Sequence, residues 1–268
     1  MKLAPKLPAH AESSIHQFLR AHVREAGASG VVVGLSGGVD SALAVRLAKD
    51  ALGASRVHGV ILPDRPYSTS LLEETEAYAR GLGVPTRTIP IDPIEAAVRA
   101  AFPAVDDRTL WGNAKARIRM LLLYSVGRSS GLLVLGTGNK SEILLGYFTK
   151  YGDGGADLLP LGDLYKTEVY ELAASLGLPT AVRERAPTAG LWEGQTDEAE
   201  LGLPYVQIDR ILRGLEELRE PAEIADLTGL APAVVASIVA RVASNRHKRR
   251  PPPIPKLSLR TIGIDWRD

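Results

Sequence analysis

The chain of 268 residues contains no cysteine. This absence excludes disulfides, cysteine-ligated zinc, iron–sulfur clusters and a thiol nucleophile. No apolar run reaches the about 20 residues that a membrane-spanning helix needs, and the first residues lack the apolar segment of a signal peptide. Lys and Arg number 32 against 31 Asp and Glu, which gives no indication of a nucleic-acid or membrane partner. We therefore expect a soluble cytoplasmic protein.

Short apolar runs alternate with amphipathic stretches through the first 180 residues. Near-continuous apolar runs are typical of parallel strands that helices cover on both faces. Strands that alternate with helices predict right-handed crossovers. We therefore predict an α/β fold, a doubly wound, Rossmann-like parallel sheet with flanking helices and a helical C-terminal part. The expected strands are 31–35, 56–62, 86–91 and 132–136.

Capping residues and glycines delimit the expected helices. Ser70 with Glu73 three residues later resembles a capping box, and Gly53 and Gly131 are expected to end two helices. The expected helices are 41–52, 71–83, one from Asp92, 113–130, 205–218, 221–228 and 232–244.

We expect one domain over residues 1–268, with an α/β core at about 10–180, a long loop at 181–204, a helical part at 205–250 and a tail at 251–268. A loop as long as 181–204 is usually functional. We expect it to close over the bound substrate, together with residues 65–70, and so to exclude water.

The strongest local pattern is GLSGGVDS at 34–41, between an expected buried strand and a helix. Its two central glycines allow the backbone to approach a ligand, and its two serines add hydroxyl donors. Together with the helix N-terminus they form a site for phosphate. Asp40 suits such a site only if a cation such as Mg²⁺ bridges its carboxylate and the phosphates.

The alternative is a plain strand–helix turn in which Asp40 stabilises the helix dipole. The segment is not a Walker loop, since GxxxxGK[ST] is absent. It resembles the pyrophosphate loop of the N-type ATP pyrophosphatases, enzymes that cleave ATP between the α and β phosphates and transfer AMP to an acceptor.

A second polar segment follows the fourth expected strand. Lysines and carboxylates at two neighbouring strand ends suit a polyanionic substrate with a metal. A solvated charged loop is the alternative. The candidate residues of this segment are Glu142, Lys150, Asp153, Asp157 and Lys166.

From about residue 10 to 255 the chain resembles the NAD synthetase family. Seven blocks follow the family pattern in order: GLSGGVDS, NAKARIRM, GTGNKSE, GYFTKYGDGGADLLPLGDLYKTEV, ERAPTAGL, QTDEAELGLPYVQID and HKRRPPP. One block departs from the ammonia-dependent members that carry GTDHAAE. The form GTGNKSE is similar to the glutamine-dependent enzymes and to some single-domain relatives.

The resemblance implies ATP-dependent amidation of deamido-NAD to NAD, the final step of NAD biosynthesis, through an adenylated intermediate with release of AMP and pyrophosphate. It also implies Mg²⁺ as cofactor and ATP as co-substrate. The residues implied for ATP are Gly34, Leu35, Ser36, Gly37, Gly38, Val39, Asp40, Ser41, Thr137, Lys166 and Thr188. Those implied for deamido-NAD are Arg117, Lys150, Asp157, His247 and Lys248; Asp40 and Glu142 would bind the metal, and Asp153 and Lys166 would be catalytic.

Glutamine use in this family resembles a thiol-based amidotransferase fused as an extra domain. Without cysteine, the chain should use free ammonia or ammonia delivered by another polypeptide, and we favour free ammonia. The resemblance further implies a homodimer.

Three other interpretations stay open. Residues 221–250 resemble a helix-turn-helix followed by basic residues, although a helical pair that caps the core explains the same pattern. Another ATP pyrophosphatase would share the glycine loop but not the TKYGDGGAD block. A non-catalytic nucleotide-binding module would not need the two metal carboxylates.

Overall fold

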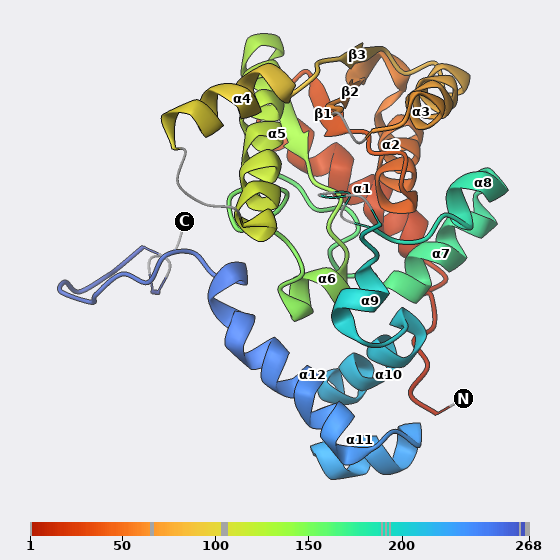
Figure 1. Cartoon of the computed structure of the whole chain (residues 1–268), viewed down its shortest axis with the longest axis vertical. Helices are drawn as coiled ribbons and strands as arrows, with labels where there is room; N and C mark the ends of the chain where they lie inside the picture. Colours follow the sequence, from red (N-terminus) through yellow and green to blue (C-terminus); the bar gives the residue numbers. More distant parts are fainter. Residues whose placement is uncertain are drawn as a thin grey trace.

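Four parallel strands form the centre of the molecule in the computed structural model (Figure 1), which describes residues 2–64, 67–102, 107–188, 190, 192, 194–262 and 264–265. The strands are β1 Gly30–Gly34, β2 Val57–Ile61, β3 Thr86–Thr88 and β4 Leu132–Leu135, in the order β3-β2-β1-β4. Val31 pairs with Val57 of β2 and Val32 with Val134 of β4. The predicted α/β class with a parallel sheet is confirmed.

Two helical layers bury the two faces of the sheet because both faces are apolar. Val31 and Val33 point into a core shared with α1 Ala11–Glu25, α2 Val39–Leu52 and α7 Lys166–Ser175. Val32 points the other way, toward α4 and α5. The remaining helices of this part are η1 Ala54–Arg56, α3 Thr69–Gly81, α4 Asp92–Ala101, α5 Arg108–Ser130 and α6 Lys140–Leu145.

A second apolar core holds the helical C-terminal part below the sheet (Figure 1). Val235 and Ile238 of α12 are buried there, so α12 packs onto α10 and α6. This packing is the one expected of a helical pair that caps the core. The elements after α7 are α8 Thr180–Arg183, α9 Asp197–Leu201, α10 Tyr205–Glu216, α11 Pro221–Thr228, α12 Pro232–Ser244 and η2 Asn245–Arg249.

Three local predictions were wrong. Ser68 rather than Ser70 caps α3, since its hydroxyl accepts from the backbone N–H of Leu71. The third strand ends at Thr88. The backbone N–H groups of Ile89 and Ile91 still donate to the carbonyls of Ile61 and Pro63, but Pro63 has no N–H to return a hydrogen bond. The segment 181–204 contains part of α8 and all of α9 instead of a single loop.

The predicted closing segments fall partly outside the described residues, namely at Arg65, Pro66, Ala189, Leu191 and Glu193. Within the described ranges, no helix combines the length and the apolarity required to cross a membrane.

Candidate active site

The strand order places two polar loops side by side. The chain leaves β1 toward β2 on one side, whereas β4 lies on the other side of β1. The carboxyl ends of β1 and β4 therefore border a switch point, where open α/β sheets bind ligands. The glycine loop follows β1, and Thr137 follows β4. Two segments about 100 residues apart thus meet at one edge of the sheet.

The two serines of the glycine loop accept hydrogen bonds from its backbone and fix its shape. Ser41 Oγ accepts from the backbone N–H of Ser36 at 3.2 Å, and Ser36 Oγ accepts from that of Gly38 at 3.3 Å. Gly37 adopts φ +79°, and a Cβ atom there would lie 2.5 Å from Leu71 Cδ1. The loop thus requires a glycine at 37. Gly38 precedes α2 without a side-chain cap, so the first N–H groups of α2 face the loop.

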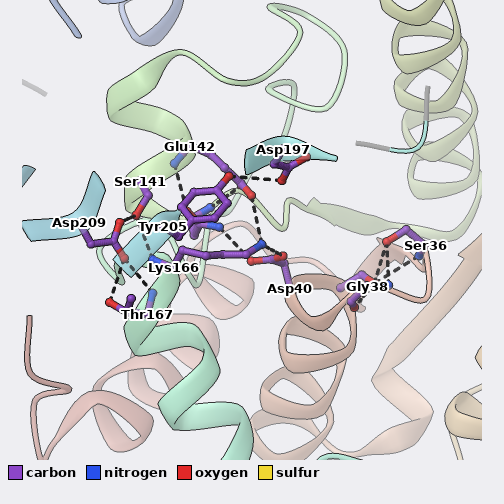
Figure 2. Close-up of polar contacts among 12 residues, drawn as sticks. Ser36, Gly38, Asp40, Ser141, Glu142, Lys166, Thr167, Asp197, Tyr205 and Asp209 are labelled. Carbon is purple, nitrogen blue, oxygen red and sulfur yellow. Dashed lines mark hydrogen bonds and ion pairs between the residues drawn. The ribbon is translucent and has the colours of Figure 1, made fainter. Parts of the chain in front are cut away.

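Lys166 joins the two loops through its ammonium group (Figure 2). Its Nζ lies 2.5 Å from Asp40 Oδ2 and 3.4 Å from Glu142 Oε1. The lysine side chain is only 3% exposed, and Asp40 and Glu142 are 18% and 17% exposed. The structure therefore brings together three residues predicted from separate blocks of the sequence.

The charges of the cluster depend on one another. Partial burial raises the pKa of Glu142 to about 8, with Lys166 lowering it and the charge of Asp40 raising it. Burial lowers the pKa of Lys166, but the two carboxylates outweigh this and raise it above the usual value. Near neutral pH the Glu142 carboxyl is therefore mostly protonated, and the ammonium of Lys166 is balanced chiefly by Asp40.

Asn139, which the sequence analysis did not identify, fixes both carboxylates. Its Nδ2 donates to Asp40 Oδ1 at 2.9 Å, and its backbone N–H donates to Glu142 Oε2 at 3.2 Å. Its Oδ1 accepts from the backbone N–H of Glu142, which completes a capping box on α6. The Asn-x-x-Glu spacing of a capping box was the signal that could have identified this residue.

Asp197 is a third acid near the cluster and was also missed. It is 3% exposed, its Oδ2 accepts from Tyr205 at 3.3 Å, and its Oδ1 has no hydrogen-bond partner among the described residues. Burial raises its pKa, and its charge in turn raises that of Glu142. Asp197 lies on α9, inside the segment predicted as a loop, where no sequence pattern indicated a buried acid.

The donor set fits a magnesium ion. Mg²⁺ usually takes one or two carboxylates and completes its octahedron with water and substrate phosphates. Asp40 and Glu142 supply two carboxyl groups beside the loop. No group of three or more His, Asp or Glu side chains in the described ranges could hold a metal alone.

Arg185 contacts the phosphate loop, which the sequence analysis did not predict. Its guanidinium donates to the backbone carbonyl of Gly37 and lies 2.5 Å from Glu74 Oε2. Thr188, predicted for ATP, accepts at its Oγ1 from the backbone N–H of Gly190 at 3.1 Å. Its contact with ATP stays a prediction.

A second group of predicted residues gathers around the turn after α6. Lys248 Nζ donates to the backbone carbonyls of Gly146 at 2.7 Å and Phe148 at 3.0 Å. Lys150 Nζ donates to the carbonyl of His247 at 2.9 Å, and Arg117 donates to that of Lys150 at 3.3 Å. The predicted residues Arg117, Lys150, His247 and Lys248 are therefore neighbours, although they come from α5, the turn and η2.

Asp153 and Asp157 have different surroundings. Asp153 lies in the same turn and accepts from the backbone N–H of Thr149 at 2.8 Å. Asp157 instead accepts from the backbone N–H of Val134 at 2.7 Å and from Tyr124 at 3.0 Å. Both Asp157 oxygens thus bind β4 and α5, and its predicted substrate contact stays a prediction.

Known proteins are similar to this chain in sequence. The profile of the NAD synthase family matches residues 12–252. The NH3-dependent NAD(+) synthetase of Methanosarcina mazei is 48% identical over 251 residues, which cover 92% of this chain and 98% of the relative.

Two solved structures resemble the fold closely. The NMN synthetase of Francisella tularensis has a TM-score of 0.82 at 32% identity, with 94% of this chain and 100% of that chain covered. The NH3-dependent NAD synthetase of Campylobacter jejuni has a TM-score of 0.77 at 32% identity, with 92% and 97% covered. The family match over most of the sequence and the geometry of the phosphate loop agree: the chain belongs to the NAD synthase family.

Proposed function

We propose that this ligase converts deamido-NAD to NAD with ATP and ammonia, and that residues 1–268 act as one synthetase domain. The contact of Lys166 with both Asp40 and Glu142, beside an open glycine loop at a sheet switch point, carries the proposal. This arrangement supplies backbone donors, a buried cation and two carboxylates where a triphosphate would bind.

In the first step the nicotinate carboxylate attacks the α-phosphate of ATP, the bond to the β-phosphate breaks, and pyrophosphate leaves. The glycine loop binds the phosphates through backbone N–H groups of residues 34–41 and the first turn of α2. Lys166, already held between two acids, neutralises charge as the pyrophosphate departs. Thr137 follows β4 at the same edge and would contact the nucleotide. The catalytic role is therefore mainly positioning and charge stabilisation.

Mg²⁺, held by Asp40 and Glu142 together with the phosphates, would neutralise phosphate charge. The raised pKa of Glu142, about 8, supports this assignment, because an added cation would favour the ionised carboxylate.

The acceptor would bind at the second group of residues. Lys150, Lys248 and Arg117 donate to backbone carbonyls and leave their positive charge for an anionic ligand such as the pyrophosphate of deamido-NAD. Asp153 would guide ammonia toward the adenylate. His247 is exposed beside these cations and would complete the acceptor site.

In the second step ammonia attacks the adenylated carboxyl carbon, AMP leaves, and the amide of NAD forms with loss of a proton. We favour free ammonia, because the chain has no cysteine to release ammonia from glutamine. We also propose a homodimer, supported by Leu121 of α5, which is 56% exposed on the helix that carries Arg117.

The direct test follows NAD and pyrophosphate together after the chain is mixed with ATP, Mg²⁺, deamido-NAD and ammonium. We expect equal amounts of both products. Asp40→Ala should abolish both, whereas Asp226→Ala, an exposed acid on α11, serves as a matched control with unchanged rates. A parallel reaction with glutamine as sole nitrogen source should yield no NAD.

Other outcomes would change the proposal. Pyrophosphate without NAD would keep the ATP site but reject the acceptor. The mononucleotide acid whose amidation gives NMN is then the next acceptor to test, given the similarity to an NMN synthetase. Absence of both products with folded protein would favour a binding module. A particle of one chain's mass at micromolar concentration in light scattering would contradict the homodimer.

A further inference from the structure

Asp209 is a buried carboxylate that none of the steps above uses. It lies on α10, in the helical C-terminal part, with no exposed surface. Its Oδ1 accepts from Ser141 Oγ at 2.5 Å, and its Oδ2 accepts from the backbone N–H and the Oγ1 of Thr167 at 2.9 and 2.8 Å. A buried charge is costly in free energy unless it is hydrogen-bonded, so these three donors fix the position of the Asp209 carboxylate.

The partners of Asp209 are the sequence neighbours of the two key charges. Ser141 precedes Glu142 in the first turn of α6, and Thr167 follows Lys166 in the first turn of α7 (Figure 2). Ser141 Oγ also accepts from the backbone N–H of Lys166 at 2.9 Å. Asp209 and Ser141 therefore join the beginnings of α6 and α7.

This junction satisfies the free N–H groups at the start of α7. The first N–H groups of a helix have no partner within the helix. Ser141 takes that of Lys166, Asp209 takes that of Thr167, and Glu168 takes that of Tyr165 at 2.9 Å. A carboxylate at this end also interacts favourably with the helix dipole. Asp209 on α10 thus fixes the direction in which α7 begins, and with it the position from which the Lys166 side chain extends.

The other end of Lys166 is fixed by the phosphate loop. Its Nζ contacts Asp40, and Asp40 accepts from Asn139, the N-cap of α6. Asp40, Asn139, the first turn of α6, Asp209, the first turn of α7 and Lys166 therefore form a closed ring of contacts. A ring of this kind holds charges to within the fraction of an ångström that positioning requires.

We propose that Asp209 is a positioning residue, which holds the first turns of α6 and α7 together so that Glu142 and Lys166 meet Asp40 at the phosphate loop. This inference rests on the proposed function, because it assigns a task to Lys166 and Glu142. A purely structural anchor for α10 would stabilise the fold without affecting turnover in the folded fraction.

The test compares Asp209→Asn with Ile208→Val, the adjacent buried residue on α10, which lies outside the ring. For Asp209→Asn we expect kcat in NAD formation to fall by about 10- to 100-fold at saturating substrates, and the Kd for ATP with Mg²⁺ to rise by about tenfold. The KM for deamido-NAD should change by less than about twofold, because the acceptor residues lie elsewhere. Ile208→Val should lower stability but leave kcat and Kd within about twofold.

Ser141→Ala removes the same link from α6, so we expect a kcat loss of at least about fivefold and no further loss in the double variant with Asp209→Asn. If Asp209→Asn does not fold, Ser141→Ala decides the question. Wild-type kcat and Kd in folded Asp209→Asn or in Ser141→Ala would overturn the proposal. If the wild-type chain forms no NAD, the proposed function fails, whereas the Kd for ATP with Mg²⁺ still tests the role of Asp209.

Discussion

The two halves of the candidate site hold their charges in different ways. On the phosphate-loop side, Lys166 is buried and contacts two carboxylates. On the acceptor side, Lys150 and Lys248 donate to backbone carbonyls, and no ion pair to a carboxylate is found for either of them in the described ranges. Carbonyls orient a lysine without neutralising it. Under the proposed function, the first half would hold a cation with phosphates and the second an anion.

The strongest test of this difference is Lys166→Met. Two carboxylates would lose the lysine that both contact, so we expect kcat to fall by at least about 100-fold and the free energy of unfolding by about 3 kcal/mol. Lys49→Met, in a pair that is more exposed, should change stability by less than about 1 kcal/mol and leave kcat unchanged. Urea unfolding and NAD formation measure both quantities. Equal effects of the two variants would remove the distinction between buried and surface pairs.

The next test concerns the shape of the phosphate loop. Gly37→Ala places a methyl group against Leu71 and Thr75, so we expect the KM for ATP to rise by about tenfold or more. Gly27→Ala is the matched control, since Gly27 also has a positive φ, +61°, but a methyl group there meets nothing within 4 Å. Both variants should share a cost of about 1–2 kcal/mol in stability. An unchanged KM in Gly37→Ala would contradict the role of the loop.

The acceptor half is tested by Lys248→Met. We expect the KM for deamido-NAD to rise by about five- to tenfold, with the KM for ATP unchanged, because a cation on that side contacts the acceptor. Lys6→Met, an exposed residue outside both halves, is the control. A rise in the KM for ATP instead would mean that the two halves are not separate.

The last test concerns a pH dependence of stability from Glu142. Its folded pKa of about 8 lies above the value of 4.5 expected for the unfolded chain. Between these values only the folded state binds the proton, so the contribution of Glu142 to stability is present below pH 4.5 and declines as the pH rises through 8. Glu142→Gln should remove this decline in urea titrations between pH 5 and 8, whereas Glu12→Gln, exposed on α1, should not. Parallel curves for wild type and Glu142→Gln would exclude the predicted shift.

Local sequence patterns predicted the sheet well but the segment 181–204 poorly. Short apolar runs predicted β1, β2 and β4 within one residue at either end. In contrast, α9 has five residues and no strong periodicity, and its buried Asp197 becomes visible only when the helix packs beside Tyr205. Short helices that depend on tertiary packing are difficult to recognise because their own sequence stabilises them little.

The sequence also predicted some residues of the candidate site and missed others. The glycine loop, Glu142 and Lys166 were predicted because each lies in a block with an interpretable pattern. Arg185 and Asp209 were not, since each acts through a residue distant in the sequence: the Gly37 carbonyl and Thr167. A single sequence contains no direct information on such pairs.

The sequence by itself determined the local elements of this protein. These are the apolar strands, the turn in which Gly37 takes a positive φ, and the charged residues that follow two strands. These depend on contacts within a few residues, which the covalent chain enforces. The tertiary structure alone decided that Lys166 lies between Asp40 and Glu142, and that Asp209 ties the two helices that carry Glu142 and Lys166. The pairing of buried charges from distant segments depends on how the layers pack. A buried charge avoids the free-energy cost of being unpaired only when the packed core brings its partner beside it.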